Sequence, residues 1–299
     1  MTGTFHKVGM GMPVYNGERY LEETLRSTLA QSYDDFSLTI ADNASTDRTR
    51  EICLDFASSD GRINYIRNPV NLGAAKNYAV CFEPVNCEYF RWANADDLAD
   101  PVLVERCVPV LDDNPDTVLV YGKTRIIGTD GEFLENYDDN LDLRAESPRE
   151  RFLECLNVLG LSNVLYGLMR REQLARTALL GNYIASDLNL IAELTLYGKF
   201  QELPETLFSR RMHPQASSWD RADQETQREF WDPSKPRFFL QKWRRIFEYY
   251  KAIHRAPITA ADKLALSGHM VKRTYWWGKP LAHEILDYLR FGLIKNQPD

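Results

Sequence analysis

Short apolar runs and amphipathic stretches alternate through the first half of the chain. The apolar runs, which are typical of buried strands, occur at residues 7–16, 36–45, 63–68, 88–93 and 117–127. Stretches that favour helices lie between them, at residues 18–32, 46–58, 71–82 and 101–111. In the first of these, Leu21, Leu25 and Leu29 recur every four residues, and Ser45 or Thr46 is available to cap the second. This alternation predicts an α/β fold in which helices cover both faces of a parallel sheet.

The pattern is less regular after residue 140. Helices are predicted at residues 147–159, with Ser147 as N-cap, and at 186–198, where Gly198 closes the helix. A strand is predicted at residues 162–170 and an extended segment at 199–214. The last third reads as helical and basic. We therefore expect a main domain at residues 1–220 and a C-terminal helical extension at 221–299.

The composition is that of an ordinary globular protein, with 44% hydrophobic and 26% charged residues. A net charge of -7 argues against nucleic-acid binding, which requires a basic excess. The 5 cysteines include no C-x-x-C pair, so neither a disulfide framework nor a zinc site is expected. The first residues do not resemble a signal peptide, and no apolar run is long enough to span a bilayer. These features predict a cytoplasmic protein.

Charge is unevenly distributed along the chain. Residues 235–299 contain 13 Lys and Arg against 5 Asp and Glu, a net charge of +8. The same segment is rich in aromatic residues, including Trp243, Trp276 and Trp277. A basic, aromatic segment of this kind can lie on an anionic membrane surface, or its aromatic residues can pack against the main domain.

An amide and two carboxylates, Asn94, Asp96 and Asp97, follow the apolar run at residues 88–93. Neighbouring carboxylates repel each other, and a divalent cation such as Mg²⁺ or Mn²⁺ relieves that repulsion. The alternative is a solvated turn in which Asp97 or Asp100 caps the next helix. The position directly after a buried strand favours the metal interpretation, because ligands collect at the carboxyl ends of parallel strands.

Polar residues also end the other predicted strands. Tyr15 and Asn16 follow the first, Asp42 ends the second, and Asn71 lies beyond the third. We expect these residues to converge in space, since parallel strands end at the same edge of a sheet. A dinucleotide fingerprint is excluded, because Val14 stands where its third glycine would be.

Further candidates suit a charged ligand, and each has a plainer interpretation. Lys76 could face a phosphate or simply be solvated. Arg210 and Arg211 have the paired donors that diphosphate oxygens favour, or they belong to a charged edge strand. His213 follows them and is a possible metal ligand or a surface histidine. Asp187 opens a predicted helix, where an acid also interacts favourably with the helix dipole.

Taken together and in this order, the motifs resemble family 2 glycosyltransferases with the GT-A fold, over roughly residues 7–218. The resemblance implies a Rossmann-like, mostly parallel sheet flanked by helices, with a helical extension. It implies nucleotide-sugar contacts at Pro13, Tyr15, Asn16, Asp42, Asn71, Lys76, Asn94, Asp96 and Arg211. It implies Mn²⁺ or Mg²⁺ at Asp96, Asp97 and His213, and a catalytic base at Asp187.

The resemblance further implies inverting transfer from a UDP-sugar to a hydroxyl of a glycan or a lipid-linked sugar, in the cytoplasm or at the inner face of the membrane. Two positions depart from the family pattern. Asn94 replaces the first acid of the usual D-A-D-D, and Ser186 stands where a glutamate usually precedes the base. The substitution at Asn94 leaves open a non-catalytic nucleotide-sugar-binding protein. A nucleotidyltransferase is a second alternative, although its Gly-rich opening loop is missing.

Overall fold

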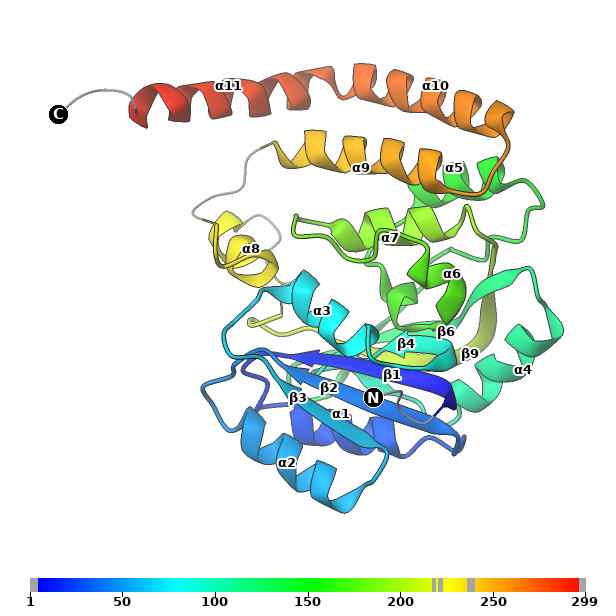
Figure 1. Cartoon of the computed structure of the whole chain (residues 1–299), viewed down its shortest axis with the longest axis vertical. Coiled ribbons are helices and arrows are strands. Elements are labelled where there is room, and N and C mark those ends of the chain that lie inside the picture. The colour runs from blue at the N-terminus through cyan, green and yellow to red at the C-terminus, as the bar shows by residue number, and fades with distance from the viewer. Residues whose placement is uncertain (1–4, 217–218, 220–222, 236–239, 296–299) are drawn as a thin grey trace.

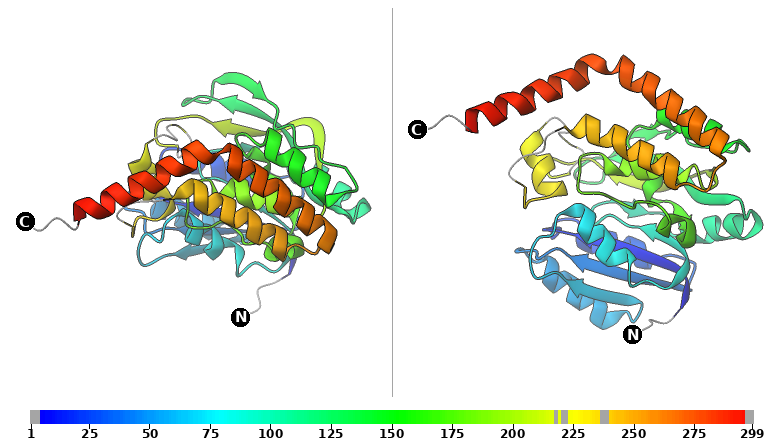
Figure 2. Two further views of the ribbon diagram at one scale, coloured as in Figure 1. Left: turned by 90° about the horizontal axis from the view of Figure 1, so that it is seen from above. Right: turned by 45° about the horizontal axis from the view of Figure 1, so that its top comes forward.

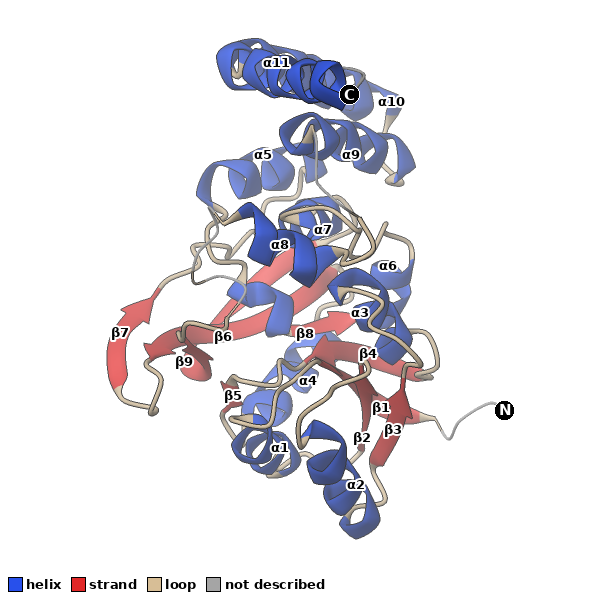
Figure 3. Cartoon of the chain, turned by 90° about the vertical axis from the view of Figure 1, so that its left-hand side faces the viewer, coloured by secondary structure: helices blue, strands red, loops and turns tan. Residues whose placement is uncertain are grey.

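The computed structural model describes residues 5–216, 219, 223–235 and 240–295. One twisted sheet forms the centre of the main body, and the C-terminal helices are stacked at one end of it (Figure 1). The helices α1, α2 and α4 lie on one face of the sheet, and α3, α6 and α7 on the other (Figure 3). The predicted fold class, a mostly parallel GT-A-like sheet flanked by helices with a helical extension, is confirmed.

The sheet has the strand order β3-β2-β1-β4-β8-β6-β9-β5, and β7 pairs with β6. The strands are β1 His6–Val14, β2 Phe36–Asp42, β3 Ile63–Arg67, β4 Cys87–Trp92, β5 Leu98–Ala99, β6 Thr117–Ile127, β7 Phe133–Tyr137, β8 Leu168–Arg170 and β9 Lys199–Arg211. The pairs formed by β1 with β2, β1 with β4, β2 with β3, and β6 with β9 are parallel. The carboxyl ends of the first four strands therefore meet at one edge.

The helices are α1 Leu21–Leu29, α2 Thr49–Ser59, α3 Ala74–Phe82, α4 Leu103–Asp113, α5 Pro148–Val158, α6 Arg171–Ala175, α7 Ser186–Leu194, α8 Gln224–Trp231, α9 Gln241–Arg255, α10 Ala260–Trp276 and α11 Gly278–Lys295. The predicted stripe of α1 is confirmed, because Leu21 and Leu25 are fully buried and Leu29 packs against the same cluster. Ser147 caps α5, since its hydroxyl accepts a hydrogen bond from the Glu150 N–H.

Three local predictions were wrong. The N-cap of α2 is Arg48, because Ser45 Oγ instead accepts a hydrogen bond from the Asn16 N–H. Helix α7 ends at Leu194 rather than at Gly198. Only the end of the predicted 162–170 strand is extended: Asn163–Tyr166 forms a 3₁₀ turn, and β8 begins at Leu168.

The C-terminal helices share a hydrophobic core with the main body. Ile253, Leu266, Met270 and Leu281 belong to the same buried cluster as residues of α3 and α7. Helix α9 lies between α7 and the α10–α11 pair, and α10 and α11 run end to end (Figures 1 and 2). The predicted division at residues 220 and 221 falls outside the described residues and stays a prediction. Among the described helices, none is long and apolar enough to cross a membrane.

Candidate active site

A cavity of about 930 Å³ opens at the carboxyl ends of β1, β2 and β4. Ten predicted site residues line it: Pro13, Tyr15, Asn16, Asn71, Asn94, Asp96, Asp97, Asp187, Arg211 and His213. The predicted convergence of the strand-end clusters is therefore confirmed. Asp42 and Lys76 are not among the lining residues.

Asn16 joins the loops that follow β1 and β2. Its backbone is left-handed, with φ of 49°, a conformation that asparagine tolerates better than most residues. Its side-chain oxygen accepts a hydrogen bond from the Thr46 N–H at 2.9 Å, and its own N–H donates to Ser45 Oγ at 2.9 Å. The neighbouring Tyr15 is 49% exposed and lines the cavity, so its ring is available to a ligand.

A chain of amide side chains supports the loops beyond β2 and β3. Asn43 Nδ2 donates to Asn71 Oδ1 at 2.7 Å. Asn68 Nδ2 lies 3.1 Å from Asn43 Oδ1 and 2.8 Å from Asn77 Oδ1, and Asn77 Nδ2 donates to the Ala41 carbonyl at 2.8 Å. Because these buried amides satisfy one another, they hold Asn71 in a fixed place at the cavity wall.

Asp42 is fully buried, and its carboxylate is engaged within the protein. It accepts hydrogen bonds from the Tyr65 hydroxyl at 2.7 Å and from the Ser45 N–H at 2.8 Å. Burial, reinforced by the Asp42 carboxylate, raises the pKa of Tyr65. In this structure Asp42 shapes the loop behind the cavity, and Lys76 is exposed on α3. Neither residue lines the cavity, and their predicted nucleotide contacts stay predictions.

Asp97 is buried, and both of its carboxylate oxygens have partners. Oδ1 accepts the Arg211 N–H at 2.8 Å, and Oδ2 accepts Asn94 Nδ2 at 2.8 Å. The Tyr78 hydroxyl in turn donates to Asn94 Oδ1 at 2.9 Å. Burial, followed by the charge of Asp96, raises the pKa of Asp97 to about 7. Asp97 therefore holds this loop, and its predicted contact with a metal stays a prediction.

Asp96 faces the cavity, and its Oδ2 lies 3.0 Å from His213 Nε2. The His213 side chain is 6% exposed and that of Asp96 29%. Burial lowers the pKa of His213, but the hydrogen bond with Asp96, the charges of Asp96 and Asp97 and the hydrogen bond with Gln215 together outweigh burial and leave the pKa above its ordinary value. Within the part of the chain that the structure describes, no group of three or more His, Cys, Asp or Glu side chains is arranged to hold a metal ion.

Arg211 makes its side-chain hydrogen bonds within the protein. Its side chain is 1% exposed; Nε donates to the Asp96 carbonyl at 2.9 Å, and an Nη donates to Glu23 at 2.7 Å. Arg211 thus fixes the backbone that presents Asp96. The adjacent Arg210 also lines the cavity, and its Nη1 donates to Asn163 Oδ1 at 2.6 Å.

Asp187 lies in the first turn of α7, as predicted, and lines the cavity. The Ser162 hydroxyl donates to Asp187 Oδ2 at 2.5 Å. Ser162 and Ala185, which precedes α7, both have left-handed backbones, with φ of 60° and 62°. Non-glycine residues rarely keep this conformation, and its presence at two positions beside one carboxylate indicates a constrained site.

Asp139 holds the turn that carries Ser162. Its oxygens accept hydrogen bonds from the Asn163 N–H and side chain, both at 3.2 Å, and from Thr124 Oγ1 at 3.3 Å. Burial raises the pKa of Asp139 to about 6. Asp139 and Ser162 were not predicted from the sequence. Neither lies in a motif, and only the fold brings them near Asp187.

Other lining residues were also missed as site residues, among them Asn77, Tyr78, Tyr166, Gln227 and Trp231. Two of these belong to α8, which the sequence analysis placed in the extension. Gly73, with φ of 80°, lies against α8, because a Cβ at this position would be 2.5 Å from the Trp231 carbonyl oxygen. The close approach of Gly73 therefore brings α8 to the cavity.

The comparisons with known proteins agree on one family. The model of glycosyl transferase family 2 matches residues 10–171. The putative glycosyltransferase EpsE of Bacillus subtilis is 36% identical over 107 residues, which are 36% of this chain and 38% of EpsE. An uncharacterized glycosyltransferase of Methanocaldococcus jannaschii is 30% identical over 187 residues, 59% of this chain and 64% of its own length. The matches thus span less than two thirds of these relatives.

Solved structures share the fold. S. aureus TarS 1-349 in complex with UDP superposes with a TM-score of 0.63 at 14% identity, covering 90% of this chain and 72% of TarS 1-349. The mannosyltransferase PcManGT from Pyrobaculum calidifontis, in complex with GDP-Man and Mn²⁺, gives 0.53 at 13% identity, covering 98% of this chain and 89% of PcManGT. With more than half of its length matched by the family model, this chain belongs to glycosyl transferase family 2.

Proposed function

We propose that this protein is an inverting, metal-dependent glycosyltransferase that moves a sugar from a nucleotide-diphosphate sugar, a UDP-sugar in the first instance, to a hydroxyl acceptor. The carrying observation is that one cavity of about 930 Å³ is lined by both Asp96 and Asp187. Family membership and the UDP or UDP-GlcNAc bound to TarS support the donor class. A glycan or lipid-linked sugar is the proposed acceptor, in the cytoplasm or at the inner face of the membrane.

The nucleotide would occupy the end of the cavity formed by the loops after β1 and β3. Pro13, Tyr15, Asn16 and Asn71 line this end. A half-exposed tyrosine ring can stack on a base, and amide side chains can pair with its polar edge. Asn94, nearer the acids, is suited to contact the ribose. The charged diphosphate would then lie toward Asp96.

The residues present fit a divalent metal that is completed by the donor. Mg²⁺ and Mn²⁺ commonly bind through one or two carboxylates together with substrate phosphates. Asp96 and His213 would hold the ion, since their side-chain atoms already lie 3.0 Å apart beside the cavity. When bound, the metal would neutralise charge that develops on the leaving diphosphate.

Asp187 is the proposed general base of a single displacement. It would accept the proton of the acceptor hydroxyl as the oxygen attacks the anomeric carbon and the bond to the diphosphate breaks. Ser162 would hold one oxygen of Asp187, leaving the other for the acceptor. Because one displacement inverts the anomeric centre, an α-linked donor should give a β-linked product.

The test is Asp187→Asn, with Glu172→Gln on the exposed surface of α6 as control. Donors are first selected from a panel of nucleotide sugars by thermal stabilisation with Mn²⁺. Asp187→Asn should still be stabilised by the donor, but it should no longer release the nucleotide when acceptor is added. A general base acts on the transition state and not on donor binding. Near-normal turnover in Asp187→Asn, or a product that retains the donor configuration, would contradict the mechanism. Stabilisation without any turnover by the native protein would instead indicate a binding protein.

A further inference from the structure

The C-terminal helices present a row of exposed apolar side chains. Its members are Leu264, Val271, Tyr275, Leu286 and Leu289, which are 77%, 60%, 83%, 52% and 53% exposed. Successive members are seven, four, eleven and three residues apart, and these spacings place their side chains on one face of an α-helix. Helices α10 and α11 run end to end (Figure 2), so at 1.5 Å per residue the row is about 38 Å long. We call it the apolar stripe.

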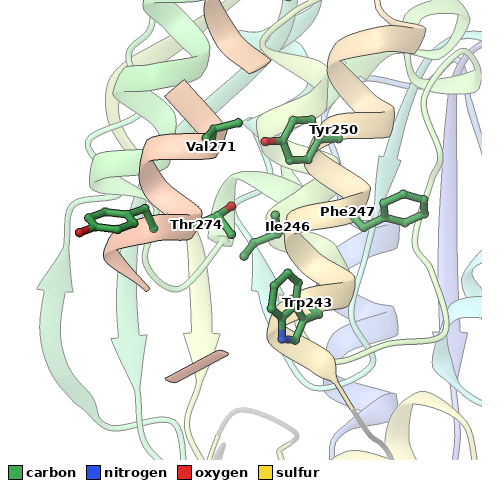
Figure 4. Close-up of a pocket in the computed structure, with 7 residues that line it drawn as sticks. Trp243, Ile246, Phe247, Tyr250, Val271 and Thr274 are labelled. Atoms are coloured by element: carbon green, nitrogen blue, oxygen red, sulfur yellow. The ribbon is translucent and has the colours of Figure 1, made fainter. Parts of the chain in front are cut away.

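An apolar groove of about 480 Å³ adjoins the stripe between α9 and α10. Figure 4 shows Trp243, Ile246 and Tyr250 of α9 facing Val271 and Thr274 of α10 across it. Val271 and Tyr275 belong to both the stripe and the groove lining. The exposed apolar surface therefore continues from the outer side of α10 onto α9.

This apolar surface is bordered by positive charge. Residues 241–295 contain 11 Lys and Arg against 4 Asp and Glu, a net charge of +7 in a chain whose total is -7. Lys272, Lys279 and Arg290 are exposed and follow one flank of the stripe at helical spacing. Of the four acids, Glu248 is buried and already paired with Arg244 at 2.8 Å. Lys272, Lys279 and Arg290 thus place positive charge along this flank of the stripe.

We infer that the face formed by α9, α10 and α11 docks on an anionic phospholipid surface, with the apolar stripe in the interfacial layer and Lys272, Lys279 and Arg290 near the lipid phosphates. Helices that combine an apolar face with flanking Lys and Arg bind membranes in this orientation, by burial of apolar area and attraction to anionic lipids. None of the described helices spans a bilayer, which leaves contact along the surface.

A second copy of the chain is the less suitable occupant. A symmetric dimer through this face would bring two segments of charge +7 together, and like charges across an interface oppose association. An anionic bilayer has the complementary charge. The inference rests on this surface alone and does not depend on the proposed glycosyl transfer.

Flotation of the full chain on a density gradient tests the inference. Vesicles of phosphatidylcholine with phosphatidylglycerol should carry the protein upward at low salt, whereas phosphatidylcholine vesicles should not. High salt should release it, since salt screens attraction to the surface. Lys272→Glu with Lys279→Glu should lower the partition coefficient at least about tenfold, because each basic residue near the surface contributes on the order of 1 kcal/mol. Leu286→Asn with Leu289→Asn should lower it as well.

Matched controls change the same chemistry elsewhere. Arg50→Glu with Arg106→Glu alters charge on α2 and α4, and Phe133→Ser with Leu134→Ser removes exposed apolar groups of β7. These variants should float like the native chain, and thermal unfolding checks that each variant is folded. The inference is overturned if the native chain does not float with anionic vesicles at low salt, or if the variants on α10 and α11 float equally well. If the native chain does not float but self-associates, and only Leu286→Asn with Leu289→Asn abolishes this self-association, the stripe is a dimer interface instead.

Discussion

An acid in place of Asn94 should destabilise the loop that carries Asp96 and Asp97. The Asn94 amide donates to the buried Asp97 carboxylate at 2.8 Å, and Asn94→Asp replaces this donor by a second negative charge at similar distance. Two unit charges about 4 Å apart near a protein surface interact by about 4 kcal/mol. Part of this cost is recovered, because the Tyr78 hydroxyl can still donate to the new carboxylate. We expect a net loss of about 3 kcal/mol in the free energy of unfolding.

Equilibrium urea unfolding in EDTA at about pH 9 measures this loss, because Asp97, whose pKa is raised to about 7, is ionised there, whereas at neutral pH it would take up a proton and relieve the repulsion. Asn94→Ala is the matched control, since it removes the hydrogen bonds of the amide without adding charge and should cost about 1–2 kcal/mol. The difference between the two variants isolates the repulsion. An Asn94→Asp variant as stable as the native protein, or more stable than Asn94→Ala, would refute the reasoning. Such a result would mean that repulsion between carboxylates at positions 94 and 97 does not lower the stability of this loop.

Two further predictions concern the turn beside Asp187. Asp139 has a pKa raised to about 6, so the native state retains a proton that the unfolded chain releases above its ordinary pKa of about 4. Its contribution to stability should therefore be present below pH 4 and be lost as the pH rises through 6, by about 3 kcal/mol in all. Unfolding of the native protein and Asp139→Asn across this range checks it, and a constant difference between the two would contradict it. Ser162→Gly should lower turnover about tenfold and leave donor binding unchanged, because it removes the hydroxyl that orients Asp187. Glycine also adopts the left-handed backbone of this position without strain, so the fold should be kept. Native turnover in Ser162→Gly would show that the hydroxyl has no part in the reaction.

Much of the main sheet could be predicted from the sequence because its signals are local. Each parallel strand near the amino end is a short apolar run bounded by polar turn residues, and the first intervening helix has a leucine stripe. By contrast, β5 has two residues, and four of the five residues of β7 are exposed. These strands form only because β9 and β6 offer partners. No local pattern distinguishes such segments from loops.

The candidate site divides in the same way. Residues directly after parallel strands were predictable, since the sheet brings the ends of its strands to one edge. The partners that fix their orientation were not. Asp96 meets His213 across 117 positions of sequence, and the Arg211 side chain donates to Glu23, 188 positions away. The residue types at Asp42 and Asp97 suited ligand binding, but their oxygens are used within the protein. A sequence motif identifies which side chains can bind, and burial decides which remain available.

The C-terminal helices bear on the reaction as well as on the surface, because α9 supports the helix that begins beside the candidate base. Asn189 Nδ2 of α7 donates to the Arg245 carbonyl at 3.0 Å, and the Ile184 N–H donates to Gln241 Oε1 at 3.0 Å. These contacts lie on either side of Asp187, at the turn where Ala185 has its left-handed backbone. Helix α9 also lines the groove beside the apolar stripe. A face that docks on lipid is thus connected, through one helix, to the carboxylate proposed to activate the acceptor. An acceptor anchored in the same lipid surface would reach the cavity from the side that these helices hold in place.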